Sequence, residues 1–205
     1  KGKQPMVVNF QITVPSSVSV ELMTSGGGIE VGDLEGSVRA ETNGGDIDLG
    51  SIGGPITVST SGGDIALDGH RAEARLSTSG GDIDVSDSRA PLHASTSGGD
   101  ITIDSAWSRV HAKTSGGDVK AHLQAPLTDS ISLETSGGEI VVTFPRAAAF
   151  SLDASTSGGS IKSKELSIQT KRGVLGKRSL EGDVNGGGQA VRLETRGGNI
   201  RLEYK

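Results

Sequence analysis

The sequence predicts an all-β protein folded as a single parallel β-solenoid, and three observations support this. The stretch STSGGDI stands at residues 59–65, and close copies of it recur along the chain. The residue numbers of the threonines in these copies rise in steps of 18 from Thr24 to Thr114, and then in steps of 21 to Thr135 and Thr156. Between copies, apolar residues alternate with other residues, which is the pattern of strands with one buried face.

Four aliphatic columns define the strands. Two lie four and two residues before each threonine, as at Ile56 and Val58, and two follow the glycine pair, as at Ile65 and Leu67. Each repeat is therefore two short strands joined by a Gly-Gly corner. One such pair has too little apolar surface to fold alone, so the repeats must stack in register. We expect a right-handed solenoid of about ten coils, because strand crossovers in parallel sheets are right-handed.

One domain is expected over residues 1–205. Residues 7–15, VVNFQITVP, carry apolar side chains on one face of an extended chain, and they predict a capping strand over the first coil with Phe10 as a plug. Regular coils are expected over residues 16–163, with a period of 18 that lengthens to 21 in two of them.

The segment 164–205 is expected to hold one irregular coil and the closing coil. Its last strand places Arg201 and Glu203 on the outer face, where charges discourage pairing with another chain. The two longer coils insert residues opposite the Gly-Gly corner. Phe144 and Phe150 flank the second insertion, and we expect them to fill a locally wider core.

Composition limits the classes of function. A net charge of −5 and a pI near 5.4 are unlike the basic surface of a nucleic-acid-binding protein. The absence of cysteine excludes disulfides and thiolate metal sites. No apolar run is long enough to span a membrane. Because the chain begins with Lys1 rather than Met, we expect a processed or truncated N-terminus whose missing part carried a targeting signal or anchor.

The corner motif itself predicts turn chemistry. The threonine shares the inward phase of the aliphatic columns, so its hydroxyl is expected to bond a backbone group in its own or the next coil. The glycines are expected to supply the positive φ angles of a tight corner.

An acidic column follows the glycine pairs: Asp46, Asp64, Asp82, Asp100, Asp118 and Glu139. Carboxylates about 5 Å apart repel each other by roughly 0.8 kcal/mol in water, so the column needs a stabilising role. In the interpretation we favour, each aspartate accepts backbone N–H bonds across its own turn. In the other, the column is a calcium ladder, because Ca²⁺ binds several carboxylate and carbonyl oxygens. However, the residue spacing of calcium-binding nonapeptide repeats is absent from this chain. Ca²⁺ is the one cofactor that the sequence suggests.

His93 and His111 share an outward column one coil apart, near Arg75. They could bind a transition metal, but no third ligand is evident, so we interpret them as solvated surface residues. Trp107 is the single tryptophan and is interpreted as a packing residue. The chain has no Ser/His/Asp or metalloprotease motif, so no catalytic residue is assigned and no enzyme is predicted.

The stretches FQITVPSSVSVELMTSGGGIEV, the serial TSGGDI and the terminal VNGGGQAVRLETRGGNIRLEY carry a family resemblance. From about residue 7 to 205, the chain resembles a bacterial β-strand-repeat domain of unknown function related to the auto-transporter adhesin, head-GIN group. The resemblance implies a β-solenoid, often secreted or anchored outside the cytoplasmic membrane, with some relatives in cell-envelope stress systems. It supplies no catalytic residue.

We therefore expect a non-enzymatic bacterial solenoid that is periplasmic, surface-exposed or secreted. Its flat faces are expected to bind a protein or cell-surface partner, or to support adhesion or envelope organisation. The alternative is a self-assembling rod that polymerises through its end coils, and a polysaccharide-active enzyme ranks last. No nucleic-acid partner is expected, and membrane contact is expected only through a segment absent from this chain.

Overall fold

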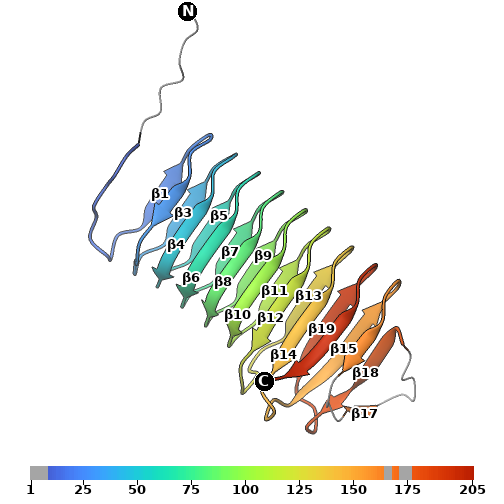
Figure 1. Cartoon of the computed structure of the whole chain (residues 1–205). Helices are drawn as coiled ribbons and strands as arrows, with labels where there is room; N and C mark the ends of the chain where they lie inside the picture. Colours follow the sequence, from blue (N-terminus) through green and yellow to red (C-terminus); the bar gives the residue numbers. More distant parts are fainter. Residues whose placement is uncertain (1–8, 164–167, 171–176) are drawn as a thin grey trace, which may run out of the picture.

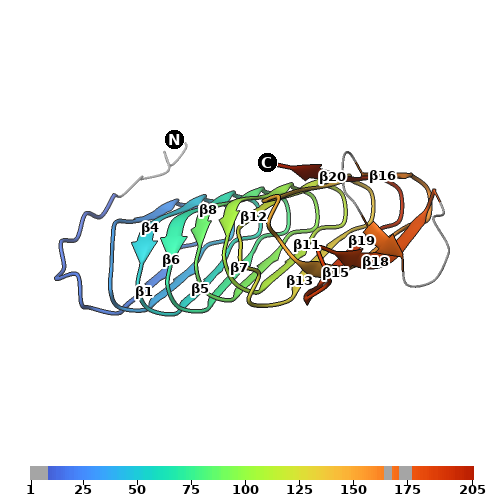
Figure 2. The ribbon, with the colours of Figure 1, turned by 90° about the horizontal axis from the view of Figure 1, so that it is seen from below.

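The computed structural model describes residues 9–163, 168–170 and 177–205, whose strands form two sheets facing each other along a rod (Figures 1 and 2). In spatial order, the eleven-stranded sheet of the described residues contains β1 (Val20–Met23), β3 (Val38–Glu41), β5 (Ile56–Ser59), β7 (Ala74–Ser77), β9 (Leu92–Ser95), β11 (Val110–Lys113), β13 (Ile131–Thr135), β19 (Gln189–Thr195), β15 (Phe150–Thr156), β18 (Ser179–Val184) and β17 (Ile168–Thr170). The nine-stranded sheet of the same residues contains β16 (Ile161–Ser163), β20 (Ile200–Tyr204), β14 (Ile140–Phe144), β12 (Val119–Leu123), β10 (Ile101–Ala106), β8 (Ile83–Ser88), β6 (Ile65–His70), β4 (Ile47–Ile52) and β2 (Ile29–Val31).

Coils stack parallel and in register, as the aliphatic columns predict. Val38 of β3 pairs with Val20 on one side and with Ile56 on the other. In the opposite sheet, Ile65 of β6 pairs with Ile47 and Ile83. Each column therefore becomes a ladder of buried side chains, and the ladders of the two sheets meet in the core. The parallel β-solenoid is confirmed.

Phe144 and Phe150, which flank the second insertion, are both fully buried in the core. Their rings stack with centroids 4.4 Å apart and planes inclined by 16°. The expectation that both residues pack in the core is confirmed, and a locally wider core stays a prediction. No helix in the described part of the chain is long and apolar enough to cross a membrane.

The number of coils differs from the expected ten. Seven coils follow one another in chain order, from β1–β2 to β13–β14. The order then changes, because β19 pairs with β13 on one side and with β15 on the other. In the nine-stranded sheet, β20 likewise lies between β14 and β16. The coil of β19 and β20, which is the last in the sequence, thus lies in the stack between the coil of β13 and β14 and the coil of β15 and β16.

The irregular segment is not a hidden coil. Of the residues described in it, β18 pairs antiparallel with β15, and β17 pairs antiparallel with β18. A turn after β18 reverses the chain, with positive φ angles at Asn185, Gly186 and Gly187. Because β20 is covered on both sides, Arg201 does not lie on an edge strand, and the expectation that its charge protects an edge is wrong.

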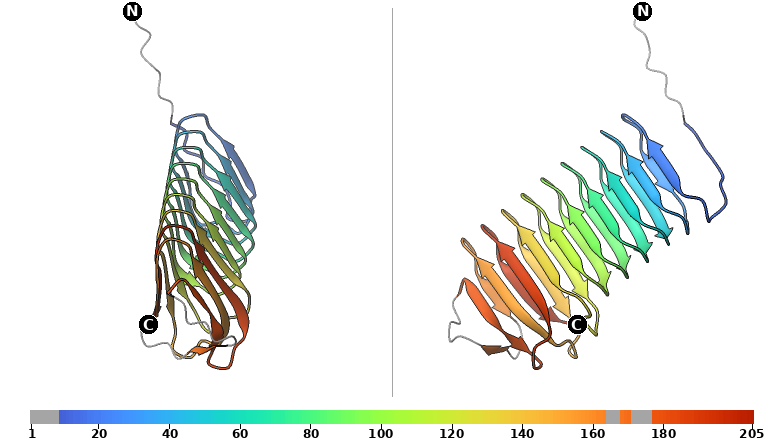
Figure 3. Two further views of the ribbon diagram at one scale, coloured as in Figure 1. Left: turned by 90° about the vertical axis from the view of Figure 1, so that its right-hand side faces the viewer. Right: turned by 180° about the vertical axis from the view of Figure 1, so that it is seen from behind.

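The predicted capping strand is also absent, because residues 9–15 form no strand and Phe10 is 85% exposed. Val8 lies outside the described residues. The carbonyl of Ser16 accepts the N–H of Glu35 at 2.7 Å, which fixes the segment in the register of the repeat. Continued backwards, this register would place polar Gln11 and Thr13 at inward positions. A one-residue offset reverses which side chains face the core, so the segment leaves the rod (Figure 3).

Candidate functional site

The threonines hold each corner from inside. At Thr60, the hydroxyl accepts a hydrogen bond from the N–H of Gly63 at 3.3 Å and donates one to the carbonyl of Gly45 in the preceding coil at 2.9 Å. Such a pair of bonds is made by Thr42, Thr60, Thr78, Thr96, Thr114, Thr135, Thr156 and Thr195. All eight are buried, as predicted, and the bond between coils reaches back to the preceding coil in the stack.

The second glycine of each pair allows the coils to approach closely. A Cβ on Gly63 would overlap the carbonyl oxygen of Gly45, whereas a Cβ on Gly62 would meet only ordinary contacts. Among the described residues, the positive φ angles lie in the turn after β18 and not at these corners. The expectation of positive φ at the corners is therefore wrong. Glycine is needed there because the backbones of adjacent coils touch.

The aspartates form a ladder between coils. Oδ1 of Asp64 accepts a hydrogen bond from the backbone N–H of Asp82 at 2.8 Å, and Oδ1 of Asp82 accepts one from the N–H of Asp100 at 2.7 Å. The other steps join Asp46 to Asp64, Asp100 to Asp118, and Asp118 to Glu139. The prediction that each aspartate accepts a backbone N–H is confirmed for the carboxylates of this ladder. The bond crosses to the next coil rather than spanning the residue's own turn.

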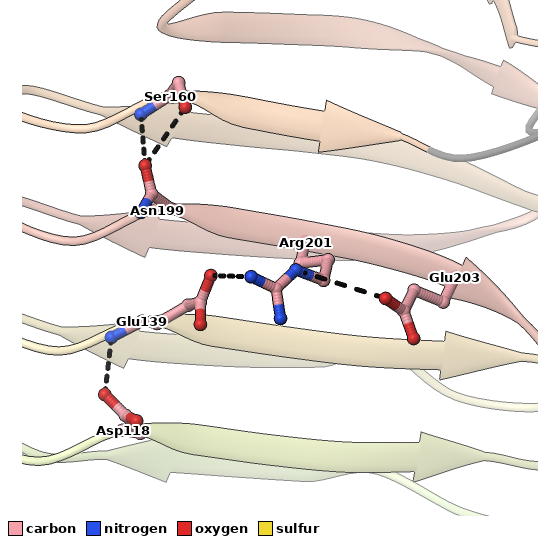
Figure 4. A network of polar contacts seen from close by, with 6 residues as sticks. All are labelled: Asp118, Glu139, Ser160, Asn199, Arg201 and Glu203. Atoms are coloured by element: carbon pink, nitrogen blue, oxygen red, sulfur yellow. Dashed lines mark hydrogen bonds and ion pairs between the residues drawn. The ribbon is translucent and has the colours of Figure 1, made fainter.

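The ladder changes chemistry at Glu139, where the coil order also changes (Figure 4). Oε1 of Glu139 makes an ion pair with the guanidinium of Arg201 at 3.1 Å, and this oxygen is buried without a hydrogen bond. In the next two coils, Oδ1 of Asn199 accepts both the N–H and the hydroxyl of Ser160, each at 3.0 Å. The inserted coil thus replaces a carboxylate by a neutral amide.

The calcium interpretation stays a prediction. Within the described ranges, no three His, Asp or Glu side chains converge on one point suited to a metal ion. One oxygen of most carboxylates in the column is already used by the ladder. The neighbouring Asp84 has its pKa raised, first by burial and then by the nearby Asp82, Asp104 and Asp64, while a hydrogen bond with Thr102 lowers it.

The two flat faces of the rod differ in charge. From β2 to β10, the outward charged residues of the nine-stranded sheet are all acidic: Glu30, Asp48, Asp68, Asp84, Asp87 and Asp104. On the eleven-stranded sheet, positive and negative side chains are mixed and form ion pairs such as Arg39–Glu21 at 3.4 Å and Lys113–Glu134 at 3.3 Å. We call the outward surface of β2, β4, β6, β8 and β10 the acidic face.

The two predicted histidines lie together on the opposite face. The ring centroids of His93 and His111 are 5.8 Å apart. Nε2 of His93 is 3.7 Å from Oε1 of Glu73, and the same carboxylate oxygen binds Arg75 at 2.6 Å. These histidines and Arg75 line a shallow hollow of about 440 Å³. The interpretation as surface residues fits this arrangement, because Arg75 already engages the carboxylate beside them.

Sequence reasoning missed a buried histidine. Nδ1 of His70 lies 2.8 Å from the carbonyl oxygen of Ala72, and Nε2 lies 3.0 Å from the hydroxyl of Ser88. Burial lowers the pKa of His70, while the carbonyl of Ala72 and the charge of Asp87 act in the opposite direction. The repeat could have revealed it, because His70 stands one full repeat after the buried Ile52 and pairs with it.

Trp107 lies at the corner that follows β10, with 40% of its surface exposed. The guanidinium of Arg89 in the preceding coil lies 5.8 Å from the centre of its ring, which is a cation–π distance. This contact joins two neighbouring coils, which agrees with a packing role for the tryptophan.

Comparison with known proteins gives one match. A family model described as Toastrack DUF4097, a repeat domain of unknown function, matches residues 11–203. Neither the curated proteins nor the solved structures give a match. The family match and the solenoid agree, because both rest on the same repeats. Since the matched region covers almost the whole chain, the protein belongs to the Toastrack DUF4097 family.

Proposed function

We propose that the protein is a non-enzymatic, extracytoplasmic binding module that contacts a protein or cell-surface partner through a flat face. The observation that carries this proposal is a continuous sheet face whose backbone is fixed by threonine and aspartate bonds at the Gly-Gly corners between Thr42 and Glu139. A rigid surface loses little conformational freedom when it binds, which favours affinity. The charges favour the acidic face, because its strands carry several outward carboxylates and no outward basic side chain. Of these carboxylates, Asp87 makes an ion pair with Arg89, which follows β8, at 2.6 Å.

The arrangement of polar groups supports binding rather than catalysis. Ser88 and His70 make the Ser–His contact described above, but both side chains are buried, and the second ring nitrogen of His70 is engaged by the carbonyl of Ala72. The carboxylates of Asp82 and Asp100 accept backbone hydrogen bonds from the next coil. Both pairs of groups thus have a structural role.

We base the extracytoplasmic role in adhesion or envelope organisation on the sequence resemblance to the auto-transporter adhesin, head-GIN group, because the matched family model names no role. The location is tested by expressing the full-length protein with an epitope tag and adding protease to intact and to lysed bacterial cells. Digestion of the tag in intact cells, or in cells whose outer membrane alone is opened, supports the proposal. Protection until the cytoplasmic membrane is broken contradicts it.

Binding is tested with purified chain and isolated bacterial cell envelopes. The acidic-face variant Asp48→Asn/Asp68→Asn/Asp104→Asn removes three outward carboxylates that lie outside the ladder. Its matched control, Arg39→Gln/Arg75→Gln/Arg192→Gln, removes three charges from the opposite face. We expect sedimentation with the envelopes to be lost in the first variant, kept in the second, and weakened by salt.

Two results would contradict this function. One is envelope binding that is lost in the control and kept in the acidic-face variant. The other is hydrolase or lyase activity on polysaccharides that Asp82→Asn or Asp100→Asn abolishes without changing the melting temperature.

A second candidate function is self-association through the end coils. It is favoured by β1 and β2, which are the terminal strands of their sheets and carry edges on which another strand could add.

A further inference from the structure

The first coil gathers most of the exposed apolar surface. Six large apolar side chains of the described residues are exposed, and five of them lie between residues 10 and 23: Phe10, Ile12, Val14, Val18 and Met23. Next to them, Val20 and Leu22 are only partly buried. Apolar residues gathered in this way mark a surface that another molecule covers.

The two ends of the rod are not equivalent. At the first coil, β1 and β2 end their sheets as parallel strands. At the other end, β18 runs antiparallel to β15 and β17 runs antiparallel to β18, so β17 is parallel to the rest of the eleven-stranded sheet. The nine-stranded sheet ends there in β16, a parallel strand. Backbone groups at the edge of a terminal strand can pair with an added strand. The first coil is therefore the end at which two open strand edges coincide with exposed apolar side chains.

Residues 9–14 do not cover this end in their own chain. The bond between Ser16 and Glu35 sets a register that, continued backwards, would place Ile12 above Glu30 and not above the buried Ile29 or Val31. A strand from a second molecule is free of this bond. Shifted by one residue, it can turn Phe10, Ile12 and Val14 towards the open core.

We propose that two copies of this chain associate head to head by exchanging residues 9–14. Each segment adds a strand to the first coil of the other copy and places its apolar side chains over the exposed end of the core. Six extended residues reach about 20 Å, which is enough to cross a neighbouring coil. Because each copy supplies one strand and one edge at the same end, a twofold arrangement satisfies both and gives a closed dimer.

The first test measures mass in solution by light scattering coupled to size exclusion, over a hundredfold range of concentration. We expect wild type to form a dimer and Phe10→Asp/Ile12→Asp to be a monomer with an unchanged melting temperature in its monomeric form, because both side chains are exposed in one copy. The control is Trp107→Ser, which removes the exposed apolar side chain outside this region and should stay dimeric. A wild-type monomer, filaments, or a dimer in the double aspartate variant would overturn the proposal.

The second test uses the lack of cysteine in the chain. A Gln11→Cys chain is mixed with a Glu30→Cys chain under mild oxidation, since both positions face outward in the exchanged arrangement. We expect a disulfide-linked heterodimer, whereas Gln11→Cys mixed with Asp104→Cys should give none. Failure of the first pair to cross-link in a solution of dimers overturns the strand exchange. The mass measurement changes no residue of the acidic face. The cross-linking pairs use Glu30 and Asp104 of that face, but they report only disulfide formation and not envelope binding, so the dimer and the proposed binding function stand or fall separately.

Discussion

The backbone N–H of Asp100 donates a hydrogen bond of 2.7 Å to Oδ1 of Asp82 in the preceding coil. This relationship explains why a solenoid can carry a column of like charges. Each carboxylate repels its neighbours along the column, but it also satisfies a backbone donor of the next coil. A hydrogen bond to a charged group contributes roughly 1.5–3 kcal/mol, which exceeds the repulsion of about 0.8 kcal/mol between adjacent charges in water.

Removing one acceptor tests the ladder. We expect Asp82→Ala to lower the free energy of unfolding by about 1 kcal/mol, since the N–H of Asp100 loses its partner at a partly exposed site. Asp82→Asn keeps an acceptor oxygen and removes a charge, so its stability should equal or exceed that of wild type. Urea unfolding measures both, with Asp104→Ala as an outward control outside the ladder. Equal losses in the Ala and Asn variants would show that the carboxylate acts in another way.

The threonine column is tested at Thr78, whose hydroxyl accepts from Gly81 and donates to Gly63. Thr78→Val keeps the shape but leaves two buried backbone groups without partners, which should cost about 2–3 kcal/mol. Thr78→Ser keeps the hydroxyl and should recover most of this loss. Thermal unfolding of the two variants gives the comparison. A Val variant as stable as the Ser variant would contradict the structural role of the hydroxyl.

The Gly-Gly corner allows a matched pair of substitutions. A Cβ on Gly81 would overlap the carbonyl of Gly63, whereas a Cβ on Gly80 would lie 3.5 Å from the carbonyl oxygen of Gly62, an ordinary contact. We expect Gly81→Ala to destabilise the rod by about 2 kcal/mol or more, and Gly80→Ala to change stability by about 0.5 kcal/mol or less. Melting temperatures measured in parallel decide this. If the two variants melt alike, close coil approach does not explain the glycine.

His70 should make stability depend on pH. Its folded pKa is lowered by burial from the ordinary value of 6.5, so the unfolded chain binds the proton more readily. The neutral His70 therefore contributes fully to the free energy of unfolding above pH 6.5. As the pH falls below 6.5, the free energy of unfolding decreases by at most about 1.4 kcal/mol per pH unit. Urea unfolding between pH 8 and pH 5.5 measures the slope.

The control for this slope uses the repeat itself. His70→Ile places in this column the residue type found at Ile52, and it should flatten the dependence whatever its effect on overall stability. A slope that persists in the Ile variant would assign the proton to another group.

Calcium is tested by melting the chain in chelator and in excess calcium. A ligand present at a hundred times its Kd, and bound only by the folded state, adds about 2.7 kcal/mol of stability. We expect equal melting temperatures, because the ladder already uses one oxygen of each of Asp46, Asp64, Asp82, Asp100 and Asp118. A clear increase that Asp82→Asn removes would instead make the column a calcium site.

Much of the site could be predicted because the repeat fixes which side chains share a column. The inward threonines and the stacked carboxylates follow from the alternation alone. The acceptor bond between Asp82 and Asp100 could not be predicted, since a column shows which residues are neighbours but not which atoms meet. The pairing of Glu139 with Arg201 was hidden for another reason: their coils become neighbours only through the inserted coil.

The sequence by itself determined the period, the inward columns and the parallel stacking, because an aliphatic face that must be buried once in every repeat allows few other folds. It did not determine the order of the last coils. Leu152 and Val191 belong to the same column, and either could pair with Ile131; the structure selects Val191. Because equivalent repeats have similar residues in each column, their sequences do not indicate which position each coil takes along the stack. Only the tertiary structure decided it, through the antiparallel strands β17 and β18 and the turn that leads the chain back between two existing coils.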